Sequence, residues 1–150
     1  MKRLWVFSLV LLSILAQAEN LSYSPLLGAQ WLTAPHPDSS SADGAREVVL
    51  AFETSVLMYQ GQRCEGGEIY VWLEKDPERI LALAEEVLQA ITDAGWVGQW
   101  SVDAARLYFP DATTGMFGVL ARGSTRNIAA VGLAVLEDVG LIVTACKILP

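Results

Sequence analysis

The two cysteines, Cys64 and Cys146, are the side chains of this sequence best suited to covalent or metal chemistry. They lie 82 positions apart, whereas redox and zinc sites use closely spaced cysteines or add several histidines. His36 is the single histidine, so we expect no metal site and no cofactor. An even number of cysteines pairs in an oxidising compartment, and we therefore predict a structural disulfide. Two free thiols and a redox pair are the alternatives.

The sequence predicts no catalytic residue. His36 lies between two prolines in a segment that we expect to be a linker, and a histidine base needs fixed partners. The sequence contains no nucleophile-elbow, phosphate-loop or dinucleotide motif. Asp103, Asp111 and Asp138 could converge in a cleft, which leaves a carboxylate-based hydrolase as an alternative, although turn positions also explain acidic residues.

Aromatic residues supply the candidate binding patch. Its members are Trp31, Tyr70, Trp72, Trp96 and Trp100. Two tryptophans lie in the glycine-flanked segment 95–100, and exposed aromatic side chains stack on sugars or anchor protein partners. The alternative is that these side chains fill the core.

The first 18 residues have the pattern of a cleaved secretory signal. Lys2 and Arg3 precede the apolar run Leu4–Leu15, and Ala16–Ala18 offers small residues for cleavage after Ala18. A membrane-spanning helix needs about 20 apolar residues, so this run is short, with an uncleaved anchor as the alternative. We expect a secreted or periplasmic protein without a membrane span in its mature part.

The composition indicates a folded, acidic protein. Hydrophobic residues make up 53% of the chain and charged residues 18%, which is too apolar for a disordered chain. The net charge of −7 argues against binding to nucleic acid, which requires a surface rich in Lys and Arg.

The pattern along the chain predicts a signal peptide at 1–18, a tail or linker at 19–45 and a single domain at 46–150. The linker is rich in proline, serine and aspartate but contains an apolar cluster at 26–32. We expect this cluster to dock on the domain, with a short interaction motif as the alternative.

The clearest predicted element is a helix over 76–94, with Asp76 as N-cap, Pro77 in its first turn and Gly95 after its end. Strands are predicted at 46–59, 68–73, 100–109, 116–121, 128–136 and 141–148. Helical spacing is an alternative for 46–59 and for 128–139. The order indicates an α+β fold, an antiparallel sheet of about five strands with one long helix, 76–94, packed across it.

These observations favour an exported, non-catalytic domain that binds a protein partner. Its aromatic segment 95–100 and its cluster 26–32 would then form an exposed patch. The first alternative is a carrier or sensor for an apolar or carbohydrate ligand, which requires a cavity of about 300 Å³ or more, expected beside Tyr70 and Trp72. The carboxylate-based hydrolase is the second alternative.

Overall fold

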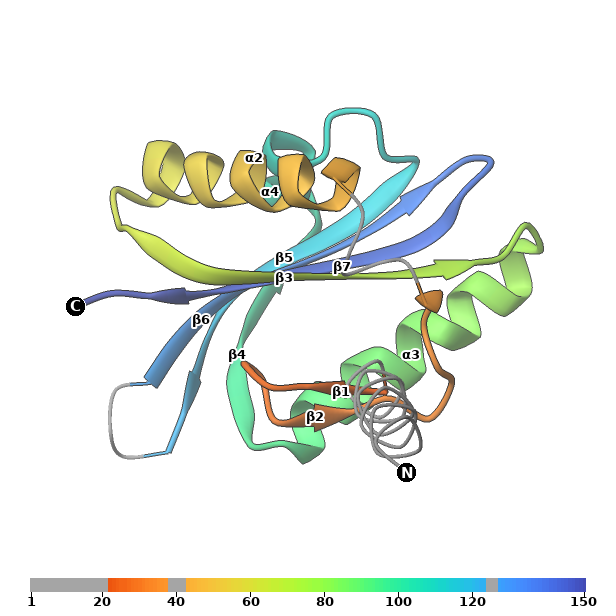
Figure 1. The fold of residues 1–150 in the computed structure, drawn as a ribbon, viewed down its shortest axis with the longest axis horizontal. Coiled ribbons are helices and arrows are strands. Elements are labelled where there is room, and N and C mark those ends of the chain that lie inside the picture. Colours follow the sequence, from red (N-terminus) through yellow and green to blue (C-terminus); the bar gives the residue numbers. More distant parts are fainter. Residues whose placement is uncertain (1–21, 38–42, 124–126) are drawn as a thin grey trace, which may run out of the picture.

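The computed structural model of the chain describes residues 22–37, 43–123 and 127–150. Within these residues, five antiparallel strands form one sheet in the order β3-β7-β6-β5-β4 (Figure 1). The strands are β3 (Cys64–Leu73), β4 (Trp96–Ser101), β5 (Thr114–Arg122), β6 (Asn127–Leu136) and β7 (Gly140–Ile148). The predicted α+β class and five-stranded antiparallel sheet are confirmed.

Both faces of the sheet are covered (Figure 1). Helices α2 (Asp43–Gln60) and α4 (Val102–Tyr108) pack on one face. Helix α3 (Pro77–Asp93) and the hairpin of β1 (Tyr23–Ser24) and β2 (Ala29–Gln30) pack on the other. The described residues therefore hold three helices, where one was predicted.

The central strands β6 and β7 are apolar on both faces because both faces are covered. Residues 129–134 and 140–146 are all buried, without the alternation of a half-exposed strand. An amphipathic helix at 128–139 would leave one side in water, and no such polar side exists. The strand prediction for this segment is therefore confirmed.

The segment predicted as a strand at 46–59 lies within helix α2, so this prediction is wrong. Phe52 and Val56, four residues apart, are buried against the sheet, whereas Leu50 and Leu57 are about half exposed. This is the helical period of 3.6 residues. The β-branched residues of the segment favoured a strand locally, but packing of the apolar stripe decides the structure.

The predicted strand 100–109 is also wrong, because the chain leaves β4 at Ser101 and forms α4. The Ser101 hydroxyl accepts a hydrogen bond from the Ala104 amide at 3.0 Å and so caps the helix. Ala105 and Tyr108 then share the buried side. The serine cap was the available signal for this short helix.

Helix α3 begins as the sequence predicts. The Asp76 carboxylate accepts a hydrogen bond from the Glu78 amide at 3.1 Å, and Pro77 occupies the first turn. Beyond the helix, Gly95 has a φ of 96°, a conformation that glycine adopts without strain. The buried residues of α3 are Ile80, Val87 and Ile91.

Residues 22–37, within the predicted linker 19–45, pack against the sheet. Leu27 is completely buried, and Trp31 is 4% exposed. Glu68 on β3 accepts hydrogen bonds from the Ser24 hydroxyl at 2.6 Å and from the Leu26 amide at 2.9 Å. The apolar cluster at 26–32 is thus largely docked. The predicted leader 1–18, its cleavage position and the polar run 38–42 lie outside the described residues.

The predicted disulfide is confirmed. Cys64 at the start of β3 is bonded to Cys146 on β7, and their Cα atoms are 5.6 Å apart. The neighbouring pair Cys64 and Ile148 lies in register on the same two strands. Among the described residues, no helix combines the length and the apolar character needed to cross a membrane.

Replacing Leu27 by alanine is expected to lower the free energy of unfolding by about 3 kcal/mol, because it opens a cavity in the core. Leu32→Ala is the matched control, since Leu32 is 84% exposed, and should change it by less than about 0.5 kcal/mol. Urea denaturation measures both. Equal effects of the two substitutions would contradict the docked hairpin.

Replacing both Cys64 and Cys146 by alanine is expected to reduce stability by about 4 kcal/mol, because the bridge closes a long loop in the unfolded chain. Denaturation should show the same loss when the wild-type protein is reduced. Reductant should leave the double variant unchanged. A wild-type protein indifferent to reduction would argue against a stabilising bridge.

Candidate functional site

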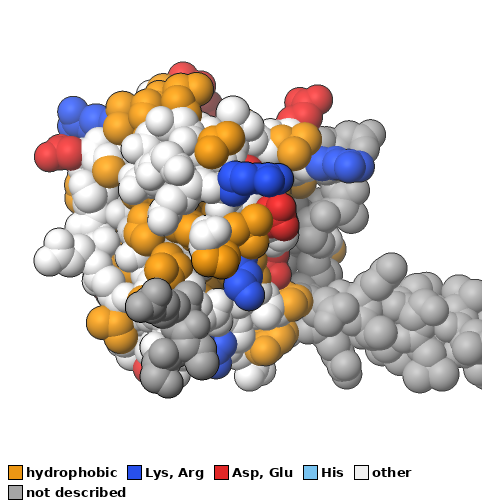
Figure 2. Space-filling model, turned by 90° about the vertical axis from the view of Figure 1, so that its left-hand side faces the viewer, with side chains coloured by type: hydrophobic (Ala, Val, Ile, Leu, Met, Phe, Trp, Pro, Cys, Tyr) orange, Lys and Arg blue, Asp and Glu red, His pale blue; other side chains and the backbone are white. Residues whose placement is uncertain are grey.

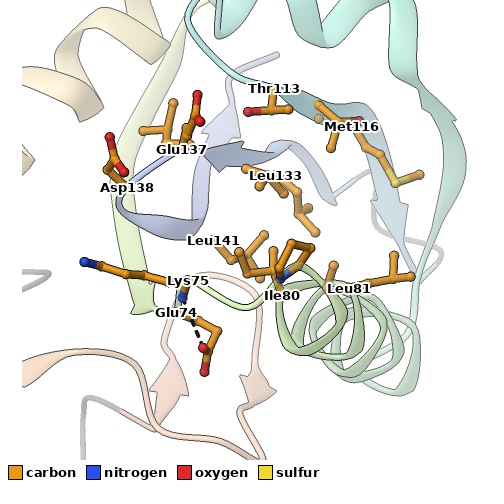
Figure 3. A pocket seen from close by; sticks show the side chains of 16 residues that line it. Glu74, Lys75, Ile80, Leu81, Thr113, Met116, Leu133, Glu137, Asp138 and Leu141 are labelled. Atoms are coloured by element: carbon orange, nitrogen blue, oxygen red, sulfur yellow. Dashed lines mark hydrogen bonds between the residues drawn. The ribbon is translucent and has the colours of Figure 1, made fainter.

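A groove lies between α3 and the sheet, at the end where β6 turns into β7. Its volume is about 730 Å³. Residues from the β3–α3 connection, the first turns of α3, the start of β5 and both arms of the β6–β7 hairpin line it (Figure 3). It is the best-defined candidate for a ligand site in the described part of the chain.

The groove follows from the unequal lengths of the sheet strands. β4 ends at Ser101, opposite Phe117, so among the described residues β5 has no strand paired on its outer side over Thr114–Met116. Helix α3 packs against β2, β4 and β7 and leaves this end of β5 and β6 open on its side of the sheet. The result is an apolar channel between the helix and the strands.

The interior of the groove is hydrophobic. Leu133 on β6 and Leu141 on β7 belong to the core and form part of its lining, and Ile80 on α3 lies across from them (Figure 3). Leu81 is 63% exposed and Met116 half-buried, so apolar surface continues to the edge of the groove. Such a surface can take up an apolar group from water.

Charged residues gather at one end of the groove. Glu74 and Lys75 come from the β3–α3 connection, and Glu137 and Asp138 from the β6–β7 turn (Figure 3). The Glu74 amide donates a hydrogen bond to the Val139 carbonyl at 3.2 Å, which ties the two connections together. The groove therefore has a charged end and an apolar end, at Leu81 and Met116.

Four of the five residues of the predicted aromatic patch lie in the core. Trp31, Tyr70, Trp72 and Trp96 are each at most 5% exposed, and Trp100 is half-buried. These four side chains therefore occupy the positions that the core-filling alternative gives them. None of the five lines the groove.

The buried aromatic side chains hold the β1–β2 segment on the sheet. The centroid of the Trp31 ring is 5.3 Å from that of Tyr70 and 5.5 Å from that of Trp72, and both contacts are edge-to-face. The Trp96 indole N–H donates to the Leu27 carbonyl at 2.7 Å, and that of Trp72 to the Thr33 carbonyl at 2.8 Å. Their role in the structure is to attach this segment.

The candidate catalytic groups do not form one cluster in the groove. Asp138 lines it, whereas Asp103 lies in the first turn of α4 on the opposite face of the sheet and Asp111 is exposed in the α4–β5 connection. His36 lies beside β3, where its amide donates to the Val71 carbonyl. Within the described residues, no group of three His, Cys, Asp or Glu side chains could hold a metal ion.

Apart from Asp138, which was a candidate carboxylate, the groove residues were not predicted from the sequence as a site. Leu81 was one signal, because it widens the apolar side of α3 beyond what the core covers. Met116, Leu133 and Leu141 look like ordinary strand residues in the sequence. Only the tertiary arrangement shows that they line an opening.

Tyr70 has an unusual environment beneath the hairpin. Its hydroxyl lies within hydrogen-bonding distance of Glu68, at 3.2 Å, and of the Tyr23 carbonyl, at 3.3 Å. Burial, and then the negative charge of Glu68, raises the pKa of the Tyr70 hydroxyl well above its ordinary value. Burial also raises the pKa of Tyr108.

These shifts predict a loss of stability in alkaline solution. In the unfolded chain tyrosine ionises near pH 10, whereas the folded protein holds Tyr70 neutral. The contribution of Tyr70 to the free energy of unfolding is therefore fully present below about pH 10 and is lost as the pH rises further. Tyr70→Phe should cost about 1 kcal/mol at pH 7. The substitution should also make the free energy of unfolding fall less steeply above about pH 10, because only the buried Tyr108 then contributes to that fall. Urea midpoints between pH 8 and 11 measure this, and identical slopes for both proteins would contradict it.

Comparison of the chain with protein-family models, with curated proteins and with solved structures found no match in any of the three.

Proposed function

We propose that this protein is an exported, non-catalytic binding domain whose groove receives the apolar part of a ligand. The observation that carries the proposal is the apolar groove between α3 and the sheet. Its volume of about 730 Å³ falls within the range of small-molecule sites, about 300–1,000 Å³. The function is that of a carrier or sensor for an apolar ligand.

The lining supports binding rather than catalysis. Ile80, Leu133 and Leu141 offer a preformed apolar surface, and the sheet and α3 fix their positions. Because the surface is already built, a ligand would not have to order it, which lowers the cost of association. Its charged groups lie at one end, where they orient a ligand without surrounding it.

Export is part of the proposal. The basic and apolar pattern of residues 1–18 supports a leader cleaved after Ala18, and the Cys64–Cys146 disulfide suits a secreted or periplasmic location. The net charge of −7 supports the absence of nucleic acid among its ligands.

A protein partner is the second candidate, favoured by exposed apolar residues on α2. Leu50 is 53% exposed, Leu57 49% and Met58 68%. Figure 2 shows hydrophobic side chains on the surface at the top of the view, at the level of α2. Such a patch can bind a protein. The groove is the more specific feature, because it combines a defined volume with a polar end.

Filling the groove should abolish ligand binding. The neutral apolar dye N-phenyl-1-naphthylamine is expected to bind the wild-type protein with a Kd of about 100 μM or below and to gain fluorescence. Ala84→Trp, on the groove side of α3, should weaken binding at least about tenfold, because an indole would occupy the space.

The matched control is Glu85→Trp, an exposed position on the same helix that does not line the groove. It should bind the dye like the wild-type protein and keep the wild-type urea midpoint, and Ala84→Trp, at a half-buried position, should still unfold in one cooperative transition. A wild-type protein that does not bind the dye would contradict the proposal. Equal binding of the dye by both variants would show that the dye binds outside the groove, and this would also contradict the proposed function.

A further inference from the structure

We infer that the groove selects an amphiphile with a positively charged head group and rejects one with a negative head group. This inference rests on the proposed function, because it assumes that the groove binds the ligand's apolar part. The carboxylates of Glu74, Glu137 and Asp138 line the charged end, and Lys75 supplies the one ammonium among the described lining residues. Three negative charges against one positive charge attract a cation, and the net charge of −7 adds to this preference.

Two features of this end would otherwise favour an anion, and each already has a partner. The first turn of α3 carries amide donors and the positive end of the helix dipole, but the Asp76 carboxylate accepts the Glu78 amide there. Arg79 lies 3.9 Å from Glu74 and 3.9 Å from Asp76. A negative head group would have to compete with these carboxylates.

The carboxylates of the β6–β7 turn are the ones available to a ligand. The Glu74 carboxylate accepts hydrogen bonds from the Lys75 amide at 3.0 Å and the Asp76 amide at 3.1 Å. Its negative charge is therefore already stabilised by amides of its own loop. Glu137 and Asp138 are exposed, and among the described residues no ion pair is formed by either. Figure 3 shows both side chains on the β6–β7 side of the charged end, across from Glu74.

The two ends of the groove match the two parts of such a molecule. An alkyl chain lying between Ile80 and Leu133 would extend toward Leu81 and Met116, away from the carboxylates (Figure 3). Its head group would then remain near Glu137 and Asp138, in contact with water. A trimethylammonium group suits this position, because the nearby carboxylates compensate its positive charge.

The test compares three molecules with the same ten-carbon chain, the two ionic ones below their micelle concentrations and the alcohol below its solubility limit. Decyltrimethylammonium, 1-decanol and decanoate compete with N-phenyl-1-naphthylamine for the full-length protein. At low salt the cation should displace the dye at about one tenth of the decanoate concentration, with decanol between them. The ratio should shrink in about 0.5 M NaCl, because the head group and carboxylates are exposed to solvent.

A charge-neutralising pair of variants separates the local carboxylates from the overall charge. Glu137→Gln with Asp138→Asn should reduce the preference to about threefold or less. Asparagine tolerates the positive φ of 67° at position 138. Glu47→Gln with Glu85→Gln removes the same charge from exposed positions outside the groove and should keep the wild-type ratio.

The outcomes distinguish this inference from the proposed function. If the dye itself does not bind, the proposed function fails. If the dye binds but none of the three molecules displaces it, the head-group inference is wrong. If all three displace it equally at low salt, the groove binds apolar chains but the head-group inference is wrong. A preference that survives neutralisation of Glu137 and Asp138 would also overturn the inference, because its source would lie elsewhere.

Discussion

The structure depends on burial of both faces of the central strands. Residues 129–134 of β6 and 140–146 of β7 expose almost nothing to water, so a layer must cover each face. Helices α2 and α4 cover one face, and α3 covers the other together with the β1–β2 hairpin. The second layer is incomplete beyond the end of β4, and this gap is the groove. The same requirement that builds the fold therefore creates its candidate binding site.

Local signals predicted the elements with caps and complete patterns. Helix α3 has an aspartate cap, a proline in its first turn and a glycine after its end, and these signals act within a few residues. The strands β6 and β7 and the disulfide were also predictable. Helix α2 was not, because its valines favour a strand locally while the spacing of Phe52 and Val56 matters only once a sheet lies beneath them.

The candidate site was less accessible to sequence analysis than the fold. Trp31, Trp72 and Trp96 look suited to binding in the sequence. In the structure they are buried, and they attach the N-terminal segment 22–37 to the sheet. The groove instead uses common aliphatic residues, such as Leu133 and Ile80, whose role depends on how far β4 extends. Strand length and helix placement are tertiary properties, and no residue type in the lining marks them.

The most direct test of the central claim is the position of a bound apolar chain. Methyl chemical shifts can be followed by NMR as decyltrimethylammonium is added to the protein. The account predicts changes centred on Met116, Leu133 and Leu141 in the groove, with little change at Val97 and Leu107, which are exposed elsewhere on the surface. Changes centred on those two outer residues, or no changes at saturating ligand, would contradict it.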